Sequence, residues 1–185
     1  MSSKHQNLSN YDPNEIPNAA HLNFGIVVSD WNKEITHTLL KGCLDTLVKH
    51  GAEPHNIHVI HVPGSYELPK GADLMANFEF MDENHEHIRM IDAVIILGCV
   101  ITGETKHDDY INQAVSNGLM QLNLVYDIPF IFGLLTPRTM EQALDRAGGK
   151  HGNKGVEAGV SAIKMADLCW KMNEMSGEDV EEAEV

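Results

Sequence analysis

The segment GCVITGETKHDDY, residues 98–110, gathers the side chains of this chain that are best suited to chemistry. An apolar run stops at Gly98, and Glu104, Thr105 and His107 follow within a few residues. If a helix begins here, its unpaired N–H groups and the Thr105 hydroxyl form an anion site. Because the chain has 11 histidines, His107 could be an ordinary surface residue, but its place beside an anion site favours a role in proton transfer.

Two other apolar runs also end in candidate binding residues. In SDWN, Trp31 either covers the core or offers a stacking surface to a flat heterocycle. In PGSYE, Gly64 permits close backbone approach, and Ser65 can cap the helix that follows. Glu67 either complements the dipole of that helix or accepts hydrogen bonds from a hydroxyl-rich ligand. The sequence contains no GxGxxG or Walker motif, so a nucleotide-binding loop is not indicated.

Basic residues are notable in a chain with a net charge of −14. Arg146 carries a guanidinium, which can grip a phosphate through two parallel hydrogen bonds. Lys154 follows nearby, whereas Lys150 is interpreted as a solvated surface charge. The segment NHEH, with His85 and His87, lacks the fixed ligand spacing of a zinc site. We therefore expect no metal site.

These candidates are positioned by four short apolar runs that alternate with segments of helical period. Runs without a polar face indicate parallel strands covered by helices on both sides. Ligands of open sheets bind beyond the carboxyl ends of the strands, which is where the candidates stand. Thr136 is predicted to cap a helix with Pro137 in its first turn. The predicted strands are residues 24–29, 56–62, 92–100 and 128–136, and the predicted helices are residues 33–49, 66–78, 108–125, 137–146 and 156–172.

Length and composition indicate one domain with polar ends. The 185 residues are 43% hydrophobic, enough for a sizeable core. Residues 1–22 are predicted to form a flexible arm, residues 23–173 the domain, and residues 174–185 a disordered acidic tail. The acidic insert 78–90 is interpreted as a surface loop or helix extension, and residues 147–155 as a glycine-rich turn. The acidic balance makes nucleic acid an unlikely partner.

The cysteines and the N-terminus bear on the cellular compartment. Cys43, Cys99 and Cys169 form no CxxC pair, and their odd number argues against a disulfide framework. They are interpreted as buried small hydrophobes of a reducing compartment. The sequence shows no signal peptide and no apolar run of membrane-spanning length. We therefore expect a cytoplasmic protein that does not bind membranes.

Five motifs together resemble the lumazine synthase family (6,7-dimethyl-8-ribityllumazine synthase). PGSYELP, GCVITGETKHDDY, FGLLT, EQALDRAG and KHGNKGVEA occur in the family's order within residues 24–172. The resemblance implies a flavodoxin-like three-layer α/β sandwich with a four-stranded parallel sheet. It also implies condensation of 5-amino-6-(D-ribitylamino)uracil with 3,4-dihydroxy-2-butanone 4-phosphate, with loss of phosphate and water and without a cofactor or metal.

The same resemblance implies a role for each site residue. Trp31, at a position that is often phenylalanine in the family, resembles the aromatic that stacks on the pyrimidine. His107 resembles the proton-transfer residue, and Phe132 the aromatic contributed by a neighbouring subunit. The implied pyrimidine and ribityl contacts further include Ser65, Tyr66, Glu67, Val100 and Ile101, the implied phosphate site is Gly103, Glu104, Thr105 and Arg146, and the implied supporting residues are Lys154 and Glu157.

Family members form pentamers, and some close twelve pentamers into a hollow shell. The short turn GGKHGN is similar to that of shell-forming members, so we expect a shell, with riboflavin synthase as a candidate partner.

Three alternatives remain open. An archaeal-type riboflavin synthase has substrates without phosphate, which the GETxH segment and Arg146 disfavour. A non-catalytic flavin-binding shell protein is disfavoured by the intact His107. A Schiff-base aldolase would use Lys154 or Lys106.

Overall fold

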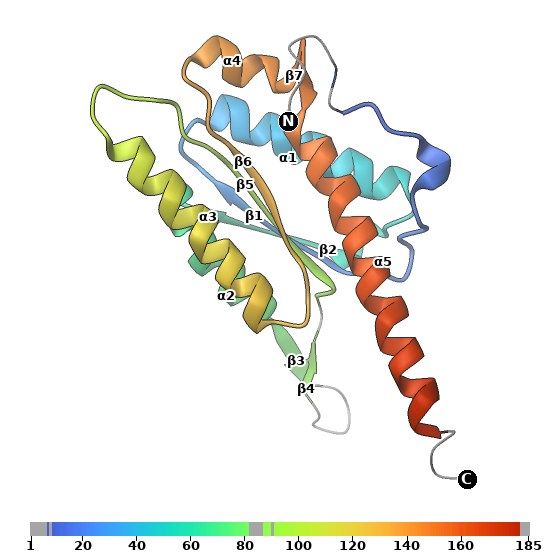
Figure 1. Ribbon diagram of the computed structural model, residues 1–185. Coiled ribbons are helices and arrows are strands. Elements are labelled where there is room, and N and C mark those ends of the chain that lie inside the picture. The colour runs from blue at the N-terminus through green and yellow to red at the C-terminus, as the bar shows by residue number, and fades with distance from the viewer. Residues whose placement is uncertain (1–6, 8, 82–86, 90, 182–185) are drawn as a thin grey trace.

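Four parallel strands form the central sheet, in the order β2-β1-β5-β6, and helices cover both of its faces (Figure 1). The structure is a computed structural model that describes residues 7, 9–81, 87–89 and 91–181. Its architecture is a flavodoxin-like three-layer α/β sandwich, as the sequence predicts. The strands of the sheet are β1 (Phe24–Ser29), β2 (Ile57–Val62), β5 (Ala93–Cys99) and β6 (Phe130–Leu135).

The two inner strands, β1 and β5, are buried along their whole length. Successive side chains of a strand point to opposite faces, so each strand supplies both layers of the core. Ile26 and Val28 pack into one layer, and Val27 packs into the other. Covering on both faces explains why these strands read as continuous apolar runs.

Each face of the sheet is covered by two long helices, which form two separate apolar layers (Figure 1). Leu39 of α1 and Ile163 of α5 pack into one layer. Leu68 of α2 and Val115 of α3 pack into the other. The helices are α1 (Lys33–Lys49), α2 (Leu68–Ala76), α3 (His107–Val125), α4 (Met140–Asp145) and α5 (Lys154–Glu181), with short 3-10 turns η1 (Pro13–Glu15), η2 (Pro54–Asn56) and η3 (Ser65–Glu67).

All four strands run in the same direction, so their carboxyl ends lie at the same end of the sheet. From β1 the chain moves outward to β2 and then returns past β1 to β5, so the direction of winding reverses between β1 and β5. All pairings in this sheet are parallel, with Val28 opposite both His61 and Leu97. Such a reversal leaves a crevice beyond the carboxyl ends, where open α/β sheets bind ligands.

The N-terminal segment is more than an arm. Ala19 and Leu22 are fully buried in the core layer that contains α1 and α5. The backbone N–H of Ala19 donates to the carbonyl of His50, 2.9 Å away, at the end of α1. The prediction that residues 1–22 lie outside the core is therefore wrong for Ala19 and Leu22, because two apolar residues in a polar stretch give no periodic signal.

Two predicted loops contain short antiparallel strands. In the acidic insert, β3 (Glu79–Met81) pairs with β4 (His87–Arg89), so the predicted loop or helix extension is wrong there. In the predicted glycine-rich turn, β7 (Ala147–Gly149) pairs with β8 (Gly152–Asn153). Strands of two or three residues are too short to show an alternating pattern, and only the pairing reveals them.

Two helix boundaries also differ from the prediction. Helix α4 begins after Thr139, whose hydroxyl accepts a hydrogen bond from the backbone N–H of Gln142, so Thr136 is not the cap. Helix α5 continues to Glu181 and thus includes part of the predicted tail, whereas residues 182–185 lie outside the described residues. None of the described helices has the length and apolarity needed to cross a bilayer.

Helices α1 and α5 approach closely at Gly155. An added Cβ there would overlap the carbonyl oxygen of Leu39 and lie 2.6 Å from its carbonyl carbon. Alanine gains about 1 kcal/mol of helix propensity over glycine, but overpacking costs about 1–3 kcal/mol. Because the obstacle is rigid backbone, the overpacking cost lies at the upper end of its range, and we expect Gly155→Ala to lower the free energy of unfolding by about 2 kcal/mol after the gain in helix propensity.

Urea unfolding followed by far-UV circular dichroism measures this loss. Gly103→Ala is the matched control, because a Cβ at Gly103 meets nothing within 4 Å. A Gly155→Ala midpoint equal to that of the control would contradict the close approach.

Candidate functional site

A pocket of about 520 Å³ opens at the carboxyl ends of β1, β2 and β5. This volume lies in the range of small-ligand sites. The pocket lies at the reversal of the winding, where the fold predicts a ligand. It is lined by ten residues that the sequence singles out: Trp31, Gly64, Ser65, Tyr66, Glu67, Val100, Ile101, Gly103, Thr105 and His107.

Hydrogen bonds tie the loops around the pocket to one another. The backbone N–H of Asp30 donates to the carbonyl of Val62, 2.8 Å away, which joins the ends of β1 and β2. The Asn32 side-chain amide donates to the carbonyl of Cys99 at 2.9 Å, which joins the ends of β1 and β5. Val100 in turn donates its N–H to the end of β6. The pocket walls are therefore held by hydrogen bonds to backbone carbonyls at the ends of β2, β5 and β6.

Trp31 sits on the tight turn between β1 and α1 and is 72% exposed. Its ring therefore does not cover the core, and the stacking interpretation is the one that the geometry favours. The turn depends on Asn32, which has a left-handed conformation with φ 60°. Asparagine tolerates this conformation better than most residues with a side chain.

Ser65 lines the pocket, and its hydroxyl is buried. The residue is 6% exposed, and among the described residues its Oγ has no hydrogen-bond partner. It does not cap a helix, because neither η3 nor α2 has a side-chain cap. A buried hydroxyl without a partner is costly, so a polar ligand group that bonds to Ser65 would be stabilising.

The loop between β5 and α3 supplies the helix start that the sequence predicts. Helix α3 begins at His107, and its N-cap residue Lys106 makes no side-chain capping bond. The backbone N–H of His107 has one long contact, 3.4 Å, to the Thr105 hydroxyl. Thr105, Gly103 and His107 line the pocket, whereas Glu104 does not. Incompletely paired N–H groups at this helix start face a site suited to an anion.

The pocket contains a cysteine that is not a nucleophile. Burial raises the pKa of Cys99 to about 12, so its thiol stays protonated at neutral pH. Cys43 is buried in the same way, which confirms the interpretation of both residues as small hydrophobes. Cys169 is only half-buried, so the prediction does not fully apply to it.

The predicted basic residues lie in a second cluster. Arg146 Nη1 donates to Glu157 Oε1 at 2.6 Å and to the carbonyl of His151 at 2.8 Å. Lys154 Nζ lies 3.3 Å from Glu157 Oε2. Two cations thus share one carboxylate, and all three side chains are largely shielded from solvent. Arg146, Lys154 and Glu157 do not line the pocket of their own chain, and no lysine or arginine is found among its described lining residues.

Phe132 is also separate from the pocket. It lies on β6, at the edge of the sheet, and is 37% exposed, whereas the other residues of that strand are buried. A large aromatic residue exposed on an otherwise buried strand suits contact with another molecule.

Four pocket residues were not singled out as ligand contacts from the sequence. Asn32 is the N-cap residue of α1, and Cys99 is the last residue of β5. Asp108 and Ile111 lie one and four residues after His107. The position of Ile111, four residues after His107, is a usable signal, because residues four apart share a helix face. The NHEH segment of the acidic insert lies outside the described side chains.

Comparisons with known proteins agree on one family. A family model described as 6,7-dimethyl-8-ribityllumazine synthase matches residues 21–169. A 6,7-dimethyl-8-ribityllumazine synthase from Parabacteroides distasonis is 53% identical over 168 residues, covering 91% of this chain and 99% of the relative. Proteins of the same name are 49% identical in Porphyromonas gingivalis, covering 91% and 98%, and 54% identical in Bacteroides fragilis, covering 82% and 99%.

The turn that carries Trp31 yields a stability prediction. Asn32→Ala and Asn32→Gly both lose the bond to Cys99. In Asn32→Ala the left-handed conformation lowers the free energy of unfolding by a further ~1–2 kcal/mol. In Asn32→Gly the greater entropy of the unfolded chain lowers it by about 0.4–1 kcal/mol. We expect Asn32→Ala to be the less stable variant in urea unfolding. Equal midpoints, or a less stable glycine variant, would contradict the left-handed turn.

Proposed function

The chain belongs to the 6,7-dimethyl-8-ribityllumazine synthase family, and we propose that it catalyses the condensation of 5-amino-6-(D-ribitylamino)uracil with 3,4-dihydroxy-2-butanone 4-phosphate. The product is 6,7-dimethyl-8-ribityllumazine, and phosphate and water leave. The observation that carries this proposal is the pocket at the strand ends. It unites an exposed indole, a buried hydroxyl without a described partner, and a helix start with a threonine and a histidine.

The pyrimidine and its ribityl chain bind on the β1 and β2 side of the pocket. The Trp31 ring stacks on the flat pyrimidine. The ribityl hydroxyls bond to the Ser65 Oγ and to the Glu67 carboxylate, while Tyr66 covers this side of the pocket. Backbone groups at Val100 and Ile101 complete the contacts at the end of β5. Ser65 supports this arrangement most directly, because its hydroxyl is buried and lacks a described partner.

The phosphate substrate binds on the β5 side. Its phosphate lies at the start of α3, against the N–H groups of the Gly103–Thr105 segment and the Thr105 hydroxyl. Glu104 contributes through its backbone, because its side chain does not line the pocket. His107 then stands next to the leaving phosphate and carries protons during imine formation, phosphate elimination and ring closure.

Part of the rate enhancement comes from holding both substrates in one pocket. Correct placement of two reactants can be worth about 7–11 kcal/mol of the barrier. A volume of about 520 Å³ suits two small molecules placed side by side. Loss of the proton carrier His107 therefore lowers the rate without abolishing the reaction.

A phosphate dianion needs a cation that the pocket of one chain lacks. Arg146 and Lys154 supply it from a neighbouring copy of the chain, together with the ring of Phe132. Three observations support this: Arg146 and Lys154 are clustered away from the pocket, Phe132 is exposed at a sheet edge, and the described pocket lining has no lysine or arginine. The site is then complete only where two protomers meet.

Glu157 prepares Arg146 for this role. A guanidinium has five N–H donors, and the Arg146 Nη1 group alone makes the bonds to Glu157 and His151. Within the part of the chain that the structure describes, the other donors of this guanidinium have no partner, so they can form a bidentate grip on phosphate. Because the cluster holds two cations and one carboxylate, it keeps a positive charge that attracts the anion.

The assembly that this arrangement requires is a closed ring, which we take to be a pentamer. The short β7–β8 turn, without an insertion, supports further closure into a shell of twelve pentamers. Riboflavin synthase, which would consume the product, is the proposed partner, and the proposed location is the cytoplasm.

The first test is product formation. With both substrates, the protein should produce the absorbance and green fluorescence of the lumazine. Arg146→Ala should raise the KM for the phosphate substrate by at least about tenfold, because a charge-assisted bond is worth about 1.5–3 kcal/mol. His107→Ala is the contrasting variant and should lower kcat while retaining measurable activity. An unchanged KM in Arg146→Ala would refute the phosphate assignment.

The second test asks whether adjacent protomers share the site. Trp31→Ala and Arg146→Ala chains are produced separately and then refolded together at equal amounts. An Arg146→Ala pocket next to a Trp31→Ala neighbour is intact, so random mixing should restore about a quarter of the sites. Mass photometry checks that oligomers have re-formed, and an affinity tag carried by only one of the two variants allows capture of oligomers that also contain the untagged chain. Activity no higher than the average of the two separate variants would show that Trp31 and Arg146 act within one chain.

A further inference from the structure

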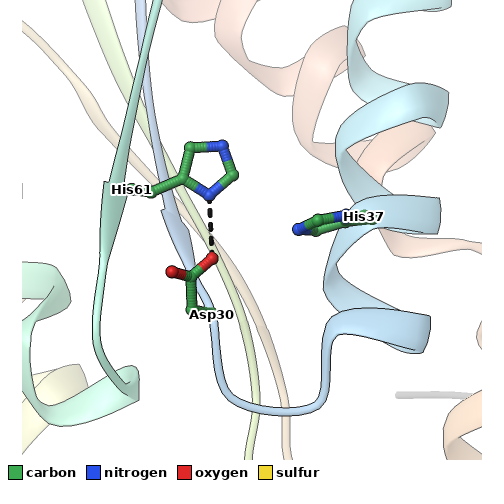
Figure 2. A group of neighbouring side chains, drawn as sticks. All are labelled: Asp30, His37 and His61. Carbon is green, nitrogen blue, oxygen red and sulfur yellow. Dashed lines mark hydrogen bonds and ion pairs between the residues drawn. The ribbon is translucent and has the colours of Figure 1, made fainter.

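Asp30, His37 and His61 form a cluster outside the pocket (Figure 2). Asp30 follows β1, His37 lies on α1, and His61 lies on β2. One ligand atom from each residue lies within 4.8 Å of the other two. The closest pair is His61 Nδ1 and Asp30 Oδ1, at 3.0 Å.

Strand, helix and one backbone hydrogen bond hold the backbone of the three residues. The N–H of Asp30 donates to the carbonyl of Val62, and His61 is in register with Val28 in the sheet. His37 lies one turn inside α1, next to Thr36, which is fully buried. Only side-chain rotations are therefore needed to change the distances within the cluster.

An ordinary ion pair accounts for only part of this arrangement. Asp30 pairs with His61 and also lies 3.8 Å from the Lys33 ammonium, so its charge is already compensated. His37 has no role in that pairing. Its ring nevertheless meets the His61 ring edge-on, at 76° with centroids 5.6 Å apart, and Figure 2 shows one of its nitrogens directed toward the other two side chains.

Two imidazoles and one carboxylate are a ligand set of the zinc type. At metal–ligand distances of about 2.0–2.2 Å, tetrahedral ligand atoms lie about 3.3–3.6 Å apart. The ligand atoms of this cluster lie no more than 4.8 Å apart. Side-chain rotations that move these atoms by about an ångström therefore bring them to the distances that a tetrahedral zinc site requires. Asp30 is half-buried and both histidines are exposed, which leaves the remaining coordination position to water.

We infer that Asp30, His37 and His61 bind a divalent transition-metal ion of the zinc class. The ion links β1, α1 and β2 at their junction. Trp31 directly follows Asp30, so the bound ion also restrains the turn that carries this ring. The inference does not depend on the reaction proposed above, since it concerns residues that do not line the pocket.

Calorimetry with zinc tests the inference on the full chain after treatment with a chelator. We expect about one strong zinc site per chain and much weaker binding of magnesium, which prefers oxygen ligands. His37→Ala/His61→Ala should lose the strong zinc site. His55→Ala is the matched control, because His55 is also exposed and lies in the η2 turn just before β2, outside the cluster. Strong binding that survives in the double variant would overturn the inference, as would the absence of strong binding in the parent.

Two further measurements locate the ion. His85→Ala/His87→Ala removes the histidines of the acidic insert and should leave zinc binding unchanged, whereas loss of binding there would assign the ion to the insert. Trp170→Phe leaves Trp31 as the only tryptophan. In that background, cobalt should quench the fluorescence of Trp31, and zinc added afterwards should restore it by displacing cobalt. Cobalt binding without quenching would place the ion elsewhere.

Discussion

The burial of β1 and β5 on both faces is the constraint on which the rest of the structure depends. A strand between two apolar layers cannot carry polar side chains along its length, because buried polar groups need partners. Polar chemistry is therefore confined to the positions that follow the strands. Since the strands are parallel, those positions all lie at the carboxyl end of the sheet, where Trp31, Ser65 and Thr105 line one pocket.

The basic residues Arg146 and Lys154 lie apart from the pocket at the carboxyl end of the sheet. The pocket holds hydroxyls, a histidine and carboxylates, whereas Arg146 and Lys154 are held by Glu157 at the start of α5. The arginine is pre-positioned without being part of its own pocket. In the assembly proposed above, the helix start of one protomer would meet the cation of the next, which would suit an anionic substrate.

Much of the fold could be predicted from the sequence. Strands β1, β5 and β6 were expected from continuous apolar runs, and α1 and α3 from helical period and sharp polar boundaries. Strands β3 and β7 were missed because segments of three residues show no pattern, and the α4 cap was misplaced because Pro137 is a weaker signal than the Thr139 hydroxyl. The buried Ala19 and Leu22 were missed for a related reason, since isolated apolar residues carry no period.

The sequence by itself determined which segments are buried and which residue types follow each strand, because local patterning decides secondary structure and burial. It therefore pointed to Trp31, Ser65, Thr105 and His107 as one site. Only the tertiary structure decided which distant residues meet. Arg146 bonds to Glu157 rather than lining the pocket, and Asp30, His37 and His61 converge although no motif joins them. Strand register and the packing of the helices set these distances, and neither can be predicted from the spacing of residues within one segment.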